Sequence, residues 1–144
     1  MRARILGTTL LLAALAAAPT VARADGSCEV LLIRASHGAG GIDTRLREIR
    51  QLSQAPLSLF REMRLVDKKA LALSGMTEAR AELSNGWTIR LRKAGVSPEG
   101  TRYEAVVQRP GGPDRIRFTA AAGAPFFTVI QRGQDAFILG FTCR

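Results

Sequence analysis

The two cysteines of this 144-residue chain limit its possible folds more than any other feature, because they lie near opposite ends of one domain. Cys28 precedes the first apolar run, and Cys143 is the second-to-last residue. In an oxidising compartment, an even pair of cysteines is expected to form a disulfide. Such a bond would close a loop of over 100 residues and place the first strand beside the last. The alternative is a catalytic thiol, although no Cys-x-x-Cys motif surrounds either residue.

The first residues of the chain indicate the compartment in which the cysteines lie. Arg2 and Arg4 form a positive first region, residues 5–18 are mostly apolar, and Ala22-Arg23-Ala24 is an A-x-A cleavage box. This order is typical of a secretory signal peptide. The apolar run of about 14 residues is shorter than the roughly 20 that a membrane-spanning helix needs.

We therefore expect residues 1–24 to be a signal peptide that is cleaved between Ala24 and Asp25. Residues 25–144 would then form a single globular domain with no transmembrane span, in the periplasm or secreted. A retained anchor, or a lipoprotein modified at Cys28, remains as an alternative.

The mature chain is basic. Removing the signal takes away three arginines and no acids, which leaves 18 basic and 12 acidic residues and a net charge of +6. The basic residues are mostly arginine and are dispersed along the sequence. A GC-rich genome would explain this usage, and attraction to an anionic polymer or membrane surface is the functional alternative.

Hydrophobic patterning predicts one helix among many strands. Residues 28–36 contain a continuous apolar run, which suits a strand covered on both faces. Leu46, Ile49 and Leu52 predict a helix over about 44–54, with Asp43 as its N-cap and Pro56 beyond its end.

Alternating apolar residues predict short strands over most of the remaining chain, including 57–66 and 69–74, with residues 94–100 as a loop. The expected fold class is α+β: a mostly antiparallel, curled β-meander of about eight strands with the single helix packed on it.

The clearest local signal is a hairpin around Ser84-Asn85-Gly86. A three-residue loop pairs Leu83 with Trp87, and Ala81 with Ile89, so that apolar residues share one face. The opposite face would then place Arg80 against Arg90 and Glu78 against Arg92.

Candidate catalytic residues are few. Gly38 to Gly41 lie between a strand and the expected helix, yet they match neither the G-x-G-x-x-G pattern nor a P-loop. We expect a connecting loop there, with an anion site as the alternative. Ser36 and His37 are neighbours in sequence, which does not make a triad, because triad members must converge in space.

Other chemistry is also hard to assign. With one histidine and no cysteine cluster, the sequence predicts no metal site and no cofactor. The acidic residues are scattered, so no pair is nominated for carboxylate catalysis. Trp87 and Tyr103 could form a ligand platform, although their alternation with aliphatic residues favours core packing.

Several stretches together resemble small secreted bacterial proteins of an uncharacterised family. They are Cys28-Glu29-Val30, Gly41-Ile42-Asp43, Pro56 with Phe60, Leu83-Ser84-Asn85-Gly86, and Gly123-Ala124-Pro125-Phe126-Phe127. The resemblance covers most of the mature domain and implies no activity and no site residues.

No catalytic set emerges, so the leading hypothesis is an exported, non-catalytic domain that binds a protein or envelope partner or stabilises an envelope assembly. The first alternative is a binder of an anionic polymer or membrane surface. The second is a hydrolase that uses carboxylates, which would need two acids facing each other across a cleft.

Overall fold

The computed structural model describes residues 26–132 and 135–144. The expected signal peptide and its cleavage site between Ala24 and Asp25 lie outside these ranges, so export stays a prediction. No helix in the described ranges is long and apolar enough to cross a membrane.

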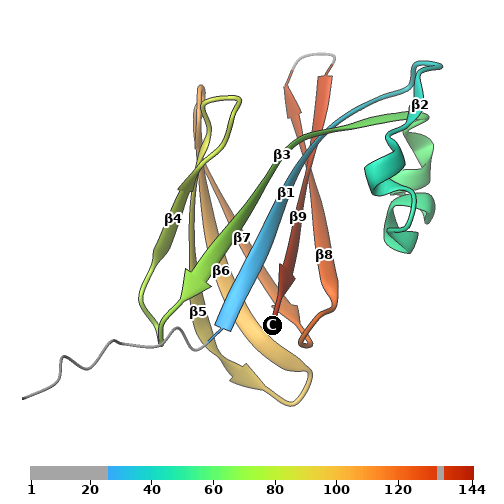
Figure 1. Cartoon of the computed structure of the whole chain (residues 1–144). Coiled ribbons are helices and arrows are strands. Elements are labelled where there is room, and N and C mark those ends of the chain that lie inside the picture. The colour runs from blue at the N-terminus through green and yellow to red at the C-terminus, as the bar shows by residue number, and fades with distance from the viewer. Residues whose placement is uncertain (1–25, 133–134) are drawn as a thin grey trace, which may run out of the picture.

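Two sheets curl toward each other and enclose the main core (Figure 1). Their strands are β1 (Gly26–Ser36), β2 (Gly41–Ile42), β3 (Glu62–Leu73), β4 (Ala79–Glu82), β5 (Thr88–Ser97), β6 (Gly100–Arg109), β7 (Gly112–Ala120), β8 (Pro125–Arg132) and β9 (Asp135–Cys143). Sheet A has the order β2-β3-β1-β9-β8, and sheet B has the order β4-β5-β6-β7. Neighbouring strands are antiparallel, except that β2 pairs with β3 in parallel.

The predicted α+β class, with a helix over about 44–54 packed on a meander, is wrong. The described chain is mostly β, and this region instead contains short 3₁₀ turns: η1 (Thr44–Leu46), η2 (Arg50–Ser53) and η3 (Leu57–Leu59).

The reason lies in the spacing of the apolar residues. Leu46, Ile49 and Leu52 recur every three residues, which is the period of a 3₁₀ helix, whereas an α-helix also needs apolar partners four and seven residues apart. Asp43 does cap a helical turn, because its side chain accepts a hydrogen bond from the backbone N–H of Arg45 at 3.1 Å.

Two strand predictions are also corrected. Residues 57–66 and 69–74 were expected as two strands, but Leu57–Leu59 is a 3₁₀ turn and β3 runs unbroken from Glu62 to Leu73. Pairing with β1 carries the strand through the charged residues at 67–69, with a register shift at Leu32/Ile33. Residues 94–100 are not a loop, since β5 and β6 extend to a tight turn between Ser97 and Gly100.

The strand β1 is covered on both faces, as its continuous apolar run predicts. Val30 and Leu32 belong to the core between the sheets, whereas Leu31 and Ile33 belong to a second core on the other face of sheet A. These four side chains are at most 7% exposed. Residues 41–61, which we call the cover segment, pack over this second core (Figure 1).

The hairpin between β4 and β5 forms with the predicted three-residue loop. Ala81 lies opposite Ile89, and the backbone N–H of Leu83 donates to the carbonyl oxygen of Trp87 at 2.7 Å. Gly86 has a φ of +87°, which a residue with a side chain adopts only at a cost.

Trp87 and Tyr103 do not form a ligand platform. They are 1% and 5% exposed and lie in the core between the sheets. Trp87 contacts Phe137 edge-on at 4.9 Å between ring centroids, and Tyr103 stacks on Phe118 at 5.1 Å.

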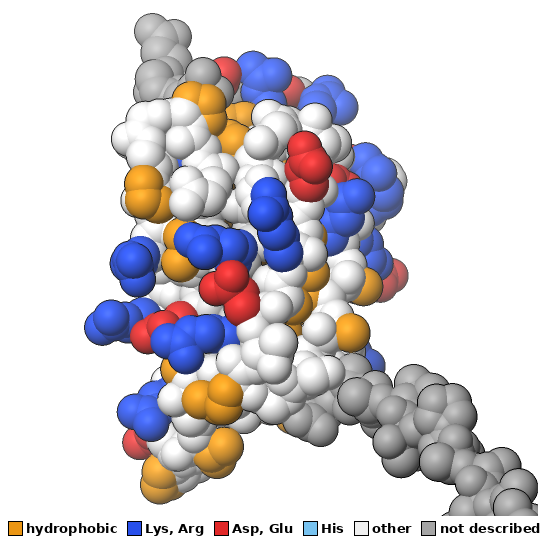
Figure 2. All heavy atoms as spheres, turned by 90° about the vertical axis from the view of Figure 1, so that its left-hand side faces the viewer, with side chains coloured by type: hydrophobic (Ala, Val, Ile, Leu, Met, Phe, Trp, Pro, Cys, Tyr) orange, Lys and Arg blue, Asp and Glu red, His pale blue; other side chains and the backbone are white. Residues whose placement is uncertain are grey.

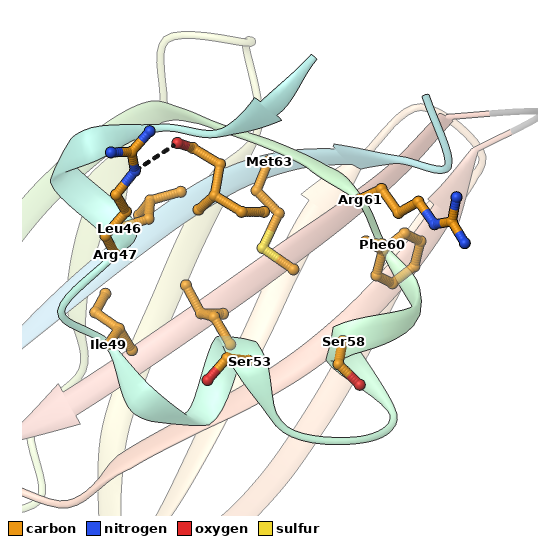
Figure 3. Close-up of a pocket in the computed structure, with 10 residues that line it drawn as sticks. Leu46, Arg47, Ile49, Ser53, Ser58, Phe60, Arg61 and Met63 are labelled. Carbon is orange, nitrogen blue, oxygen red and sulfur yellow. Dashed lines mark hydrogen bonds between the residues drawn. The ribbon is translucent and has the colours of Figure 1, made fainter. Parts of the chain in front are cut away.

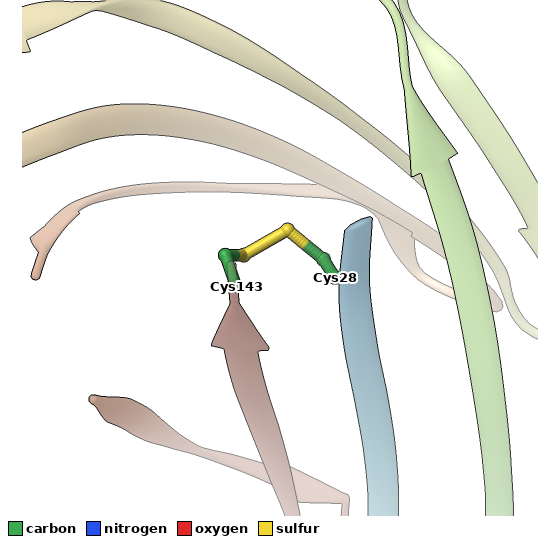
Figure 4. Close-up of a disulfide and its surroundings, with 2 residues drawn as sticks. All are labelled: Cys28 and Cys143. Carbon is green, nitrogen blue, oxygen red and sulfur yellow. A yellow bond between two sulfur atoms is a disulfide. The ribbon is translucent and has the colours of Figure 1, made fainter. Parts of the chain in front are cut away.

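A disulfide joins Cys28 of β1 to Cys143 of β9, as predicted (Figure 4). The two residues lie directly opposite each other in neighbouring strands, and each is 1% exposed. The bond closes a loop with a sequence separation of 115 residues.

We predict that removing this cross-link destabilises the domain. In the chain-entropy model, a loop of this length contributes about 4–5 kcal/mol to the free energy of unfolding. Urea unfolding of the oxidised protein and of Cys28→Ala/Cys143→Ala should show this loss. Wild-type protein reduced in denaturant and refolded, with its thiols counted, separates loss of the bond from loss of the sulfur atoms. An unchanged midpoint in the reduced protein would contradict the prediction.

Candidate functional site

The cover segment does not fill the face of sheet A on which it lies. It leaves an open cup with a volume of about 530 Å³, lined by Ile42, Leu46, Arg47, Ile49, Leu52, Ser53, Ser58, Phe60, Arg61 and Met63 (Figure 3). This volume lies within the range of about 300–1,000 Å³ that is usual for small-molecule sites.

The walls of the cup are mainly apolar. Leu46, Leu52 and Met63 are at most 4% exposed and belong to the second core. Ile49 and Phe60 pack against that core but stay half-buried. Short 3₁₀ turns bury one side chain each in η1, η2 and η3, so they cover a sheet face less completely than a continuous amphipathic helix would.

Two arginines lie at opposite ends of the cup (Figure 3). The Nε of Arg47 donates to the carbonyl oxygen of Ile42 at 3.3 Å, which leaves the two Nη groups of Arg47 free of that bond. Neither Arg47 nor Arg61 forms an ion pair within the described ranges. The cup therefore combines an apolar interior with uncompensated positive charge at its edge.

Asp43 ties the cover segment to sheet A. Its carboxylate accepts hydrogen bonds from the backbone N–H of Leu65 at 3.2 Å and from the Arg45 guanidinium at 2.7 Å. Its own N–H donates to the carbonyl oxygen of Met63 at 2.8 Å. The hydrogen bonds and charge of Arg45 hold the pKa of Asp43 well below its usual range. Asp43 is thus an ionised anchor beside the cup, a role beyond its predicted one as a helix cap.

His37 supports one wall of the cup. Its ring stacks on Phe60 at 5.1 Å between centroids, and its Nδ1 lies 3.0 Å from the carbonyl oxygen of Leu59. A carbonyl oxygen only accepts, so Nδ1 carries the hydrogen and donates.

Ser36 and His37 do not form a hydrolytic pair. The Ser36 hydroxyl donates to Oε2 of Glu62 at 3.2 Å, whereas the Nδ1 of His37 turns to Leu59. A serine–histidine pair needs the imidazole within hydrogen-bond reach of the hydroxyl, and no hydrogen bond joins these two side chains in the described ranges.

The glycine-rich segment at 38–41 is a connection that ends in β2, not an anion site. The Glu62 side chain packs against it: a Cβ on Gly40 would lie 2.5 Å from Cδ of Glu62. The Gly38 N–H donates to the Ser36 hydroxyl at 3.2 Å. A protein carboxylate therefore already occupies the space where an anion would bind.

The fold gives little support to the alternative of a hydrolase that uses carboxylates. A small hollow of about 280 Å³ includes Glu62 and Asp135, but Arg64 and Arg34 pair with these acids at 3.4 Å and 3.1 Å. Each acid therefore already has an arginine partner, and the hollow offers no uncommitted pair of carboxylates for catalysis. Within residues 26–132 and 135–144, no group of three or more His, Cys, Asp or Glu side chains could hold a metal ion.

The cup was not foreseen from the sequence. Its lining comes from β2, η1, η2, η3, β3 and the residues between them. Of its apolar residues, the sequence predicts Leu46, Ile49 and Leu52 on one face of a helix and places Phe60 and Met63 in a strand. The one available signal was the three-residue spacing, which indicates short turns.

Comparison with known proteins assigns no family. No family model, no curated protein and no solved structure matches this chain. The resemblance to small secreted bacterial proteins stays a prediction.

We predict that Asp43→Asn lowers the melting temperature at neutral pH, because the ion pair with Arg45 is lost. The pKa of Asp43 is lowered on folding from 3.8, so its ionised form stabilises the fold above that value. As the pH falls below 3.8, the unfolded chain takes up the proton first and this stabilisation declines.

Thermal unfolding at pH 6 and at pH 2.5 should therefore show a smaller difference between wild type and Asp43→Asn at the lower pH. Glu48→Gln removes an exposed acid of the same segment and should leave the melting temperature almost unchanged at both values. An equal difference for Asp43→Asn at the two pH values would contradict the ionised anchor.

Proposed function

We propose that this chain is an exported, non-catalytic binding domain whose cup holds a small amphiphile with an apolar body and an anionic head. One observation carries the proposal: an open apolar cup is bounded by arginines without ion-pair partners in the described ranges.

The apolar walls supply the affinity. Ile49 and Phe60 are half-buried and line the cup, so a ligand would complete the burial of surface that the fold leaves partly exposed. Burying apolar surface contributes roughly 25 cal/mol per Å², and a medium-length alkyl chain would also contact Met63 and Leu52.

Arg47 supplies the preference for an anion. Its Nε is already bonded to the Ile42 carbonyl oxygen, so the side chain has less freedom to lose when its Nη groups bind a carboxylate. Because Arg47 is exposed, we expect a contribution of up to about 1 kcal/mol, or roughly fivefold in affinity.

Export is the second part of the proposal. The signal-like first 24 residues and the disulfide between Cys28 and Cys143 support a periplasmic or secreted location. A protein or envelope partner, which the sequence suggested, would be an additional ligand of the same domain.

Calorimetric titration with decanoate and with decanol tests the cup. We expect both to bind, with decanoate binding more tightly. Ser58→Trp places a large side chain at the lip of the cup and should abolish binding of both. Ser74→Trp, at an exposed position outside the cup, is the matched control and should bind like wild type.

Arginine variants then test the head group. Arg47→Gln should remove most of the preference for decanoate over decanol while leaving decanol binding unchanged. Arg50→Gln, an exposed arginine of the same segment that does not line the cup, should keep the preference. If neither compound binds, or if Ser58→Trp binds both like wild type, the proposal fails.

A further inference from the structure

The outer face of sheet B gathers arginines that the sequence disperses over 38 positions, from residue 80 to residue 117. We call this surface the arginine face, which is seen from outside in Figure 2. It is defined by Arg80 of β4, Arg90 and Arg92 of β5, Arg102 of β6, and Arg115 and Arg117 of β7.

Alternation along the strands directs these side chains outward. In β5, Ile89 and Leu91 are fully buried in the core, so Arg90 and Arg92 point away from it. In β7, Phe118 is buried at 6% exposure, which places its neighbour Arg117 on the outer side. Strand pairing then aligns the outward residues of all four strands.

One row across the sheet brings like charges together. Arg80 lies directly opposite Arg90, which lies opposite Val106, which lies opposite Arg115. Like charges at opposite positions destabilise a sheet. Glu78 offsets Arg90 at 3.6 Å, but Arg80 and Arg115 form no ion pair within the described ranges.

The next row is partly neutralised. Glu104 lies between Arg92 and Arg117 and forms an ion pair with each of them. With Glu78 and Glu82 the face holds three acids against six arginines, so it keeps a net charge of +3.

A hollow lies between these side chains. It has a volume of about 400 Å³, and its polar lining residues are Arg102, Glu104, Arg117 and Thr119, together with Tyr103. Gly95 leaves room for the guanidinium of Arg102, because a Cβ there would lie 2.5 Å from Nη2. The guanidinium of Arg102 therefore lies close against the backbone at Gly95.

We propose that the arginine face binds a linear anionic polysaccharide. In the row of Arg80, Arg90 and Arg115, three of the four strands carry a guanidinium group, and neighbouring strands lie about 4.8 Å apart. This spread of positive charge suits a chain that carries repeated carboxylate or sulfate groups. An anion between Arg80 and Arg90 would also relieve their repulsion.

Two other polyanions fit less well. Binding of single-stranded nucleic acid uses aromatic platforms, and the aromatic residues of β6 and β7, Tyr103 and Phe118, face inward. A membrane surface favours exposed large apolar side chains, but those on the described surface, Leu59, Val66, Met76 and Val96, lie outside the rows of the arginine face.

This site is independent of the cup. The cover segment and sheet B lie on opposite sides of the molecule, with sheet A between them (Figure 1). Failure of the cup to bind an amphiphile would therefore leave this proposal standing, and the reverse also holds.

Binding to heparin, used as the probe polysaccharide, tests the proposal over a series of salt concentrations. We expect wild type to bind more weakly as salt rises and Arg80→Gln/Arg115→Gln to bind more weakly at every concentration. The slope of log affinity against log salt should fall by about two in this variant, one for each lost contact. Arg80→Lys/Arg115→Lys should restore most of the slope.

The matched control removes the same charge elsewhere. Arg50→Gln/Arg144→Gln changes two exposed arginines that also lack ion pairs in the described ranges, and it should keep the wild-type slope. All four positions are exposed, and melting curves confirm that each variant folds.

Several results would overturn the proposal. They are equal losses in the two glutamine variants, no heparin binding by wild type, or binding that salt does not weaken. Tighter binding to vesicles of phosphatidylglycerol and phosphatidylcholine than to heparin, lost in Arg80→Gln/Arg115→Gln, would assign the face to a membrane instead.

Discussion

The burial of β1 on both faces is the constraint on which the rest of the structure depends. Val30 and Leu32 require an apolar cover on one side of sheet A, and Leu31 and Ile33 require one on the other. Sheet B supplies the first cover and the cover segment supplies the second (Figure 1). The disulfide then fixes β1 to β9, so the strand between both covers is joined covalently to the end of the chain.

Sheet B and the cover segment differ in how completely they bury the two faces of sheet A. That difference produces the two candidate sites. Sheet B presents an alternating inner face whose large side chains are mostly buried in the main core, which leaves its outer face free to carry charge. The cover segment has too few apolar side chains for the face it covers, and the cup remains. The arginine face and the cup therefore both follow from one requirement, which is that β1 is buried on both of its faces.

Much of the β structure could be predicted from the sequence, because hairpin signals are local and a cysteine pair identifies two strands that lie close together. The Ser84-Asn85-Gly86 hairpin follows from pairing rules, and the β1–β9 contact follows from two cysteines at the chain ends. The helix prediction was wrong because the apolar residues of 44–54 recur every three residues and lack the four- and seven-residue spacings of an amphipathic α-helix. The arginine face could not be predicted, because it depends on which strands pair: Arg80 and Arg115 share one row only through the register of four strands.

The open cup has a stability cost that a small change in sequence could remove. Residues at its lip include Ser53 and Ser58, where larger apolar side chains would cover Ile49 and Phe60. Cavity-filling substitutions commonly stabilise a domain by about 0.5–2 kcal/mol, and they lower function where the open surface is itself the site. Asp43 strengthens this argument, because an ionised anchor with bonds to Arg45 and Leu65 holds the segment in a position that leaves the apolar surface open. A segment whose only role was to cover sheet A would be more stable if it closed over this apolar surface.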